Sequence, residues 1–123
     1  MPVEFEPARH VPGVLMTFRP SGRALPLVFD SPHSGRDYPE DFDHAPPRDL
    51  LRRAEDAFVD ELFETAPVHG AVFLKALFPR SYIDPNRHEH EVDLTMLGEP
   101  WPHPVVESEK AEKDHCLNHR LIK

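Results

Sequence analysis

Among the histidines and carboxylates of this sequence, two residues are candidate metal ligands because of where they lie. His33 follows an apolar run that ends in a turn-rich segment, and Asp56 lies in the next stretch of helical pattern. A catalytic zinc ion takes three protein ligands and keeps one open position, where a bound water has a pKa near about 7. Such a site could hydrolyse an amide. A loop histidine that caps backbone groups is the alternative for His33.

The helical pattern leaves open which of two adjacent carboxylates would face such a site. On an ideal helix Glu55 shares the face of Leu51 and Phe58, and Asp56 points to solvent. If the helix instead begins near Ala54, Asp56 lies in its first turn, where the helix dipole favours a carboxylate. Periodicity alone does not choose between Glu55 and Asp56.

Arginines further along the chain could hold an anionic substrate. The guanidinium groups of Arg80 and Arg87 can bind carboxylates through two parallel hydrogen bonds, which lysine cannot do. Asn86 could donate its side-chain amide to the same carboxylate, although asparagine is also common in turns. The alternative for the arginines is a pair of surface ion pairs with Asp84 or Glu89.

The other histidines do not form a metal-binding pattern with a carboxylate base. His115 and His119 are four residues apart and would share one helix face, but an exposed, charged helix explains that spacing more simply. His88, His90 and His103 have no helical partner at the spacing of metal ligands.

The elements that would position these residues follow from hydrophobic periodicity. We expect an arm at 1–12, an edge strand at 14–18, buried strands at 25–30, 70–77 and 80–84, and a helix at 48–66. Strand, loop, helix and strand indicate a right-handed parallel crossover and therefore an α/β fold with a mainly parallel or mixed sheet. Ligands gather outside the carboxyl ends of such strands, where His33 and the segment 84–87 would lie.

Composition excludes several classes of protein. The net charge is −8, which disfavours a nucleic-acid partner. No apolar run approaches the ~20 residues of a membrane span, and the amino terminus lacks the features of a secretory signal. The only cysteine, Cys116, allows neither an internal disulfide nor a thiolate cluster. We expect a cytoplasmic protein that acts on a small molecule.

Three motifs together resemble the N-formylglutamate amidohydrolase family in order and spacing. They are Asp30-Ser31-Pro32-His33-Ser34-Gly35, Ala54-Glu55-Asp56-Ala57-Phe58-Val59-Asp60 and Phe78-Pro79-Arg80-Ser81-Tyr82-Ile83-Asp84-Pro85-Asn86-Arg87. The resemblance runs from about residue 12 to residue 109. It divides the chain into the arm (1–12), the N-terminal portion of an amidohydrolase domain (13–109) and a divergent tail (110–123).

The resemblance implies a phosphorylase/hydrolase-like three-layer α/β sandwich, related to zinc carboxypeptidases and incomplete in this chain. It also implies zinc-dependent hydrolysis of the formyl amide of N-formyl-L-glutamate, a step of histidine degradation. His33 and Asp56 would be zinc ligands, and the pattern of Asp84, Asn86 and Arg87, helped by Arg80, would bind the substrate carboxylates.

The family's domain is longer than this chain, so the third metal ligand and the catalytic base are expected beyond Lys123. Two alternatives follow. The same scaffold could hydrolyse another N-acyl amino acid, or this chain could be catalytically silent. Histidine and carboxylate ligands also suit manganese, iron or cobalt.

Overall fold

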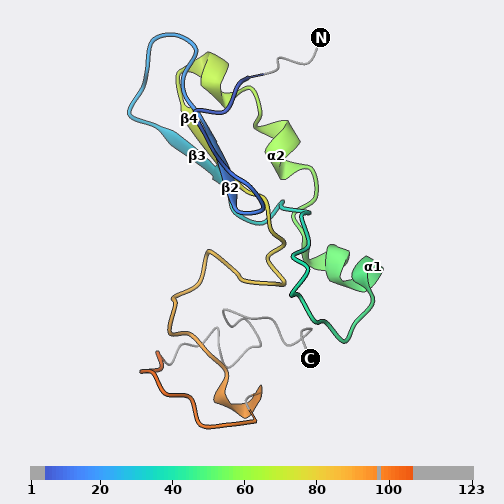
Figure 1. Ribbon diagram of the computed structural model, residues 1–123. Helices are drawn as coiled ribbons and strands as arrows, with labels where there is room; N and C mark the ends of the chain where they lie inside the picture. The colour runs from blue at the N-terminus through green and yellow to red at the C-terminus, as the bar shows by residue number, and fades with distance from the viewer. Residues whose placement is uncertain (1–4, 97, 107–123) are drawn as a thin grey trace.

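The computed structural model describes residues 5–96 and 98–106. A four-stranded sheet in the order β1-β2-β4-β3 dominates the structure (Figure 1). The strands are β1 (Arg9–Val11), β2 (Leu15–Phe18), β3 (Val28–Ser31) and β4 (Val72–Ala76). β1 and β4 both pair with β2 in antiparallel fashion, whereas β3 and β4 are parallel. The predicted α/β class is confirmed, as a mixed sheet with a parallel crossover.

The amino-terminal strands form a hairpin that the sequence analysis described only in part. Arg9–Val11 lie in the predicted arm but pair with Leu15–Phe18, and Gly13 turns the chain with a φ of 71°. β2 is therefore an inner strand, and the prediction of an edge strand was wrong. The strand β1 was missed because three residues are too short to show an alternating pattern.

The other correction in the sheet concerns β3, which was predicted to be a buried strand. It forms the edge of the sheet, and the side chain of Val28 is 64% exposed. In the described part of the chain β3 pairs only with β4. Its carboxyl end is different, because Ser31 there is buried.

The single helix predicted for 48–66 is broken in the structure. It consists of α1 (Arg48–Leu51), the 3₁₀ helix η1 (Arg52–Ala54), α2 (Val59–Leu62) and, after a turn, the 3₁₀ helix η2 (Ala66–His69). Glu55 is extended, with ψ at 142°, and Phe58 has a left-handed φ of 65°. These two residues interrupt the helix and bend the chain between α1 and α2, which hydrophobic periodicity does not encode.

Residues 80–84 form a turn, so the third predicted strand was also wrong. The backbone N–H of Tyr82 donates to the carbonyl oxygen of Pro79 at 3.0 Å, and the N–H of Asn86 donates to the carboxylate of Asp84 at 2.9 Å. The excursion from 88 to 106 contains one short 3₁₀ helix in its described residues, η3 (Leu94–Met96). It extends away from the sheet in Figure 1.

The core is small and lies against the sheet. Ala66, Ala71 and Phe73 form its buried cluster, and Phe18 and Phe29 pack against it. Phe63, directly after α2, stacks on Phe29 of β3 with ring centroids 5.4 Å apart. No helix within the described residues is long and apolar enough to cross a membrane. The predicted tail at 110–123, with His115 and His119, lies outside the described residues.

Candidate active site

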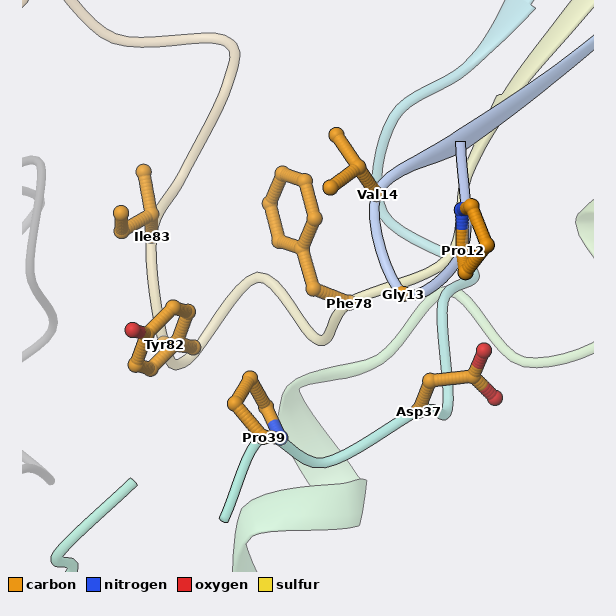
Figure 2. Close-up of a pocket in the computed structure, with 8 residues that line it drawn as sticks. All are labelled: Pro12, Gly13, Val14, Asp37, Pro39, Phe78, Tyr82 and Ile83. Carbon is orange, nitrogen blue, oxygen red and sulfur yellow. The ribbon is translucent and has the colours of Figure 1, made fainter. Parts of the chain in front are cut away.

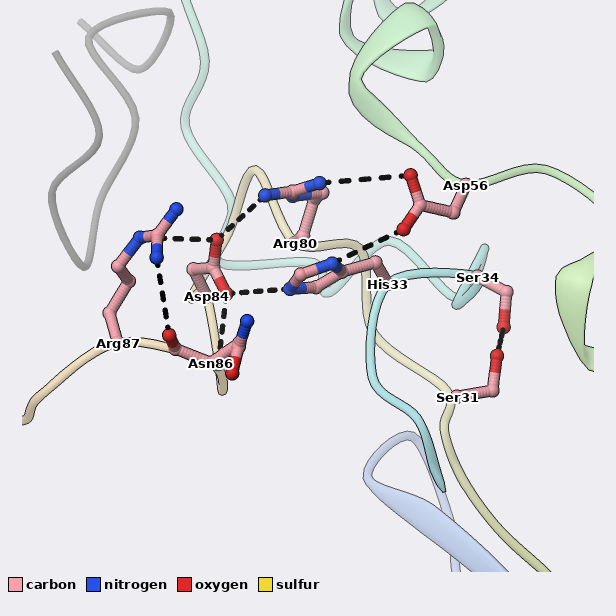
Figure 3. A network of polar contacts seen from close by, with 8 residues as sticks. All are labelled: Ser31, His33, Ser34, Asp56, Arg80, Asp84, Asn86 and Arg87. Atoms are coloured by element: carbon pink, nitrogen blue, oxygen red, sulfur yellow. Dashed lines mark hydrogen bonds and ion pairs between the residues drawn. The ribbon is translucent and has the colours of Figure 1, made fainter. Parts of the chain in front are cut away.

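His33 lies in a loop that begins where β3 ends, as predicted. The hydroxyl groups of Ser31 and Ser34 are hydrogen-bonded at 2.6 Å, and both residues are buried (Figure 3). At Gly35 a Cβ would collide with the backbone of Leu77 and Phe78, so only glycine allows the loop to approach the segment after β4 this closely. The loop is thereby held against the chain that leads to Arg80.

Both ring nitrogens of His33 face carboxylates. Nδ1 lies 3.3 Å from Oδ2 of Asp56, and Nε2 lies 2.7 Å from Oδ1 of Asp84 (Figure 3). His33 and Asp84 are buried, whereas the Asp56 side chain is 52% exposed. The side chain of His33 therefore contacts acidic groups and does not cap the backbone. Its own carbonyl oxygen accepts the N–H of Asp56 at 3.0 Å.

The bend between α1 and α2 explains how adjacent carboxylates face different ways. Glu55 turns inward, where its side chain is 2% exposed and accepts the hydroxyl of Tyr38 at 2.6 Å. Asp56 points across the loop to His33. Burial, together with the bond to Glu55, raises the pKa of Tyr38. Glu55 thus has the inward position that periodicity gave it, and Asp56 has the position beside His33.

The His33 and Asp56 pair fits two corners of a tetrahedral zinc site. Ligand bonds of about 2.0–2.1 Å at tetrahedral angles place two ligand atoms about 3.3–3.4 Å apart. The distance from Nδ1 of His33 to Oδ2 of Asp56 is 3.3 Å. Metal-bound histidines commonly donate their second ring N–H to a carboxylate, and Asp84 is placed to accept it. Among the residues the structure describes, no group of three or more potential ligands could hold a metal ion.

The two arginines converge on the carboxylate of Asp84. Nη2 of Arg80 donates to Oδ2 of Asp84 at 3.0 Å, and Nε of Arg87 lies 3.9 Å from the same oxygen. Arg80 also reaches Asp56, with Nη1 3.8 Å from Oδ1. The ion pair with Asp84 that the sequence offered as an alternative is therefore present.

In each arginine one buried nitrogen makes no hydrogen bond within the part of the chain that the structure describes. The Nε atoms of Arg80 and Arg87 are buried and lack a hydrogen-bond partner among the described residues. A buried donor without an acceptor costs about 1–3 kcal/mol, so an anion that binds here would relieve that cost. Asn86 sits between Asp84 and Arg87 in the same turn, and its carbonyl oxygen accepts Nη1 of Arg87 at 3.4 Å.

A second polar network near the site was missed by the sequence analysis. Asp60 is buried and accepts Nη2 of Arg36 at 3.4 Å and Nζ of Lys75 at 3.3 Å. Arg36 also donates to Glu61 at 3.2 Å. Asp60 is part of the second motif, and its position four residues after Asp56 was the only signal that could have indicated this network.

The remaining described histidines do not join His33. The N–H of His90 donates to Nδ1 of His88 at 3.1 Å, and the ring of His103 packs against Trp101. These contacts are local and lie in the excursion after the site. Among the described residues, these histidines belong to no group that could hold a metal ion.

The sequence of this chain matches a known protein family. Residues 25–120 match the sequence profile of the N-formylglutamate amidohydrolase family, which is most of the chain. The chain belongs to this family. The match includes all three motifs and continues into the tail after residue 109.

A solved structure supports membership of the amidohydrolase family. This chain is similar to the crystal structure of N-formylglutamate amidohydrolase from Ralstonia eutropha JMP134, with 44% sequence identity and a TM-score of 0.80. The alignment covers 87% of this chain and 38% of that enzyme, so this chain spans well under half of its solved relative. Among curated proteins, no significant match was found.

Proposed function

We propose that this chain forms the amino-terminal part of a metal-dependent enzyme that hydrolyses the formyl amide of N-formyl-L-glutamate to formate and L-glutamate. The observation that carries the proposal is the cluster in Figure 3, where His33 and Asp56 lie beside two arginines whose buried Nε atoms have no hydrogen bond within the described residues. Family membership and the solved amidohydrolase support the same reaction.

The charges of the site suit a doubly charged anion. The carboxylates of Asp56 and Asp84 balance the guanidinium groups of Arg80 and Arg87, so a divalent cation would leave an excess of two positive charges. N-formyl-L-glutamate carries two carboxylates. Arginines bind carboxylates at fixed geometry, which would orient the formyl group for attack.

Each residue has a distinct part in this proposal. His33 and Asp56 would hold the metal, and zinc, when bound, would supply a water of lowered pKa and a polarised carbonyl. Asp84 would accept Nε2–H of His33, and Nδ1, which faces Asp56, would then be the nitrogen that binds the metal. Arg87 and Arg80 would bind the substrate carboxylates, assisted by Asn86. A third ligand and the catalytic base are expected outside the described residues.

The same proposal covers the fold and the cellular role. We infer that the mixed sheet is part of a phosphorylase/hydrolase-like three-layer sandwich related to zinc carboxypeptidases. The reaction would belong to histidine degradation in the cytoplasm. The acidic net charge of −8 and the single cysteine are compatible with that location.

Formate release from N-formyl-L-glutamate tests the proposal. We would assay the purified 123-residue protein with and without zinc, together with a hybrid in which this chain replaces its counterpart in the Ralstonia eutropha enzyme. Zinc-dependent formate from the hybrid is expected. In the hybrid, Arg87→Ala should raise KM about tenfold or more, since a charged hydrogen bond contributes about 1.5–3 kcal/mol.

The controls separate the alternatives. A folded hybrid that releases no formate at any zinc concentration would refute the proposal. If the hybrid hydrolyses N-acetyl- or N-succinyl-glutamate faster than N-formyl-L-glutamate, the enzyme acts on another N-acyl amino acid. Asp43→Asn in the hybrid is the matched control, because Asp43 is exposed and lies outside the cluster. Activity of the 123-residue protein itself would show that its own residues complete the site.

A further inference from the structure

Phe58 has a backbone conformation that is costly for its residue type. It is the only described non-glycine residue with a positive φ, at 65°, and it directly precedes α2. A large aromatic side chain in the left-handed region is an outlier, and such residues persist only where the surroundings impose them. Phe58 is also 56% exposed, so burial of its ring does not explain the conformation.

Asp56 lies between two residues that interrupt the helix. The chain is extended at Glu55 and left-handed at Phe58. The N–H of Asp56 then donates to the carbonyl of His33 at 3.0 Å, and the Asp56 side chain reaches the ring. A continuous helix through 55–58 would bond the Asp56 N–H within the helix and turn the carboxylate away.

Arg36 connects this turn to the loop that carries His33. Its guanidinium lies over the Phe58 ring, with Cζ 5.3 Å from the ring centroid. The same guanidinium donates to Asp60 and Glu61 in α2, and Asp60 in turn accepts Nζ of Lys75 from β4. Arg36 therefore holds the turn through its contact with the ring of Phe58 and through its ion pairs with α2.

We propose that Phe58 is a positioning residue, whose left-handed backbone and Arg36-capped ring hold Asp56 beside His33. The importance of that placement for metal binding rests on the function proposed above, but the placement itself does not. In this role Phe58 does not itself bind the metal or orient His33 and Asp56 by a polar contact. It acts through the backbone of residues 56–58 and through Arg36.

Amide hydrogen exchange of the 123-residue protein measures this placement without metal or substrate. In Phe58→Gly the left-handed conformation no longer carries a steric cost, so the melting temperature should equal or exceed that of the wild type. The Asp56 amide should nevertheless exchange at least tenfold faster, because the ring contact with Arg36 is lost. Phe58→Tyr keeps the ring and should exchange like the wild type.

A second variant guards against an uninformative fold defect. Arg36→Gln keeps the backbone strain but removes the cation over the ring, and it too should accelerate exchange at Asp56 more than at the amides of β4. Unchanged exchange at Asp56 in both Phe58→Gly and Arg36→Gln would overturn the proposal. Equal acceleration at Asp56 and throughout β4 would also overturn it, because Phe58 would then act only on global stability.

The result is separable from the test of the enzyme's function. Zinc affinity of the hybrid enzyme, measured by competition with a chromophoric chelator, should fall about tenfold in Phe58→Gly and be restored in Phe58→Tyr. If the wild-type hybrid releases formate but exchange at Asp56 is unaltered in Phe58→Gly and Arg36→Gln, only the role of Phe58 is rejected. Altered exchange without any formate release would reject the function and keep the role of Phe58.

Discussion

At the scale of single residues, Asp84 connects more of the candidate site than any other side chain. It is fully buried, and its two oxygens contact His33, Arg80 and Arg87. A carboxylate repels the carboxylates of a substrate, so Asp84 would contribute to substrate binding through the arginines that it orients. Arg80 links this cluster to Asp56 as well.

We predict that Asp84→Asn destabilises the fold by about 1.5–3 kcal/mol, the usual contribution of a hydrogen bond to a charged group. The reason is that Arg87 would lose its ion pair with Asp84, and Arg80 would keep only the longer one with Asp56. Urea unfolding at pH 7 measures the change. Asp43→Asn, at an exposed position, should change stability by less than about 0.5 kcal/mol. Equal stability of the two variants would contradict the central role of Asp84.

At the scale of elements, the bend between α1 and α2 separates two carboxylates that are adjacent in sequence. Glu55 holds the long loop through Tyr38, whose ring also packs on Phe42 at 6.0 Å and under the guanidinium of Arg48 at 4.7 Å. Burial raises the pKa of Tyr38, and its bond to Glu55 raises it further. The folded state therefore favours the protonated phenol.

This pKa shift predicts a loss of stability at high pH. The contribution of Tyr38 is fully present below about pH 10, the ordinary pKa of tyrosine, and is lost as the pH rises above it, since the unfolded chain releases the proton first. Urea unfolding between pH 8 and pH 11 should show the decrease. Tyr38→Phe should be less stable at pH 8, because the buried Glu55 loses the hydrogen bond from Tyr38, and its stability should decrease less at high pH.

The second tyrosine supplies the control for this measurement. The hydroxyl of Tyr82 donates to the exposed Asp41, and this bond raises the pKa of the partly exposed Tyr82. Tyr82→Phe should therefore keep most of the alkaline loss seen in the wild type. If the alkaline loss of stability vanishes in Tyr82→Phe and persists in Tyr38→Phe, Tyr82 causes it and the prediction for Tyr38 is wrong.

At the scale of the whole molecule, the described sheet has β1 and β3 as its edge strands, and a pocket lies beside the β1–β2 turn. β3 pairs only with β4 in the described chain, and Leu27 and Val28 are 46% and 64% exposed. The pocket, of about 440 Å³, lies between the β1–β2 turn and the turn that follows β4, where Val14, Phe78 and Tyr82 line it (Figure 2). The solved relative is a much longer chain, of which this one covers 38%.

The open edge predicts self-association of the 123-residue protein. An exposed apolar edge strand offers unpaired backbone groups to a second chain, and a charge on the edge blocks such pairing. Sedimentation velocity should therefore show a concentration-dependent increase in mass that Val28→Lys reduces. Val14→Lys is the matched control, because Val14 is 43% exposed but lies in the β1–β2 turn. Association that is equal in the two variants would exclude the β3 edge.

The sequence by itself determined the strands that carry the site and the residues that gather there. Continuous apolar runs predicted the segments of β2, β3 and β4, and turn-rich residues placed His33 at a strand's carboxyl end. The motifs named Asp56, Arg80, Asp84 and Arg87, and the structure brings these residues into contact with one another or with His33. Whether they bind metal and substrate remains a prediction for the experiments above.

Only the tertiary structure decided how these residues face one another. The helical pattern of 48–66 could not reveal the break, because Phe58 and Leu62 lie 56% and 74% exposed although their spacing is that of a buried face. The segment 80–84 has the composition of a strand, yet ion pairs of Arg80 and Asp84 hold it as a turn. Periodicity reports which residues are apolar, whereas long-range contacts such as Asp84 with His33 decide the direction of the chain.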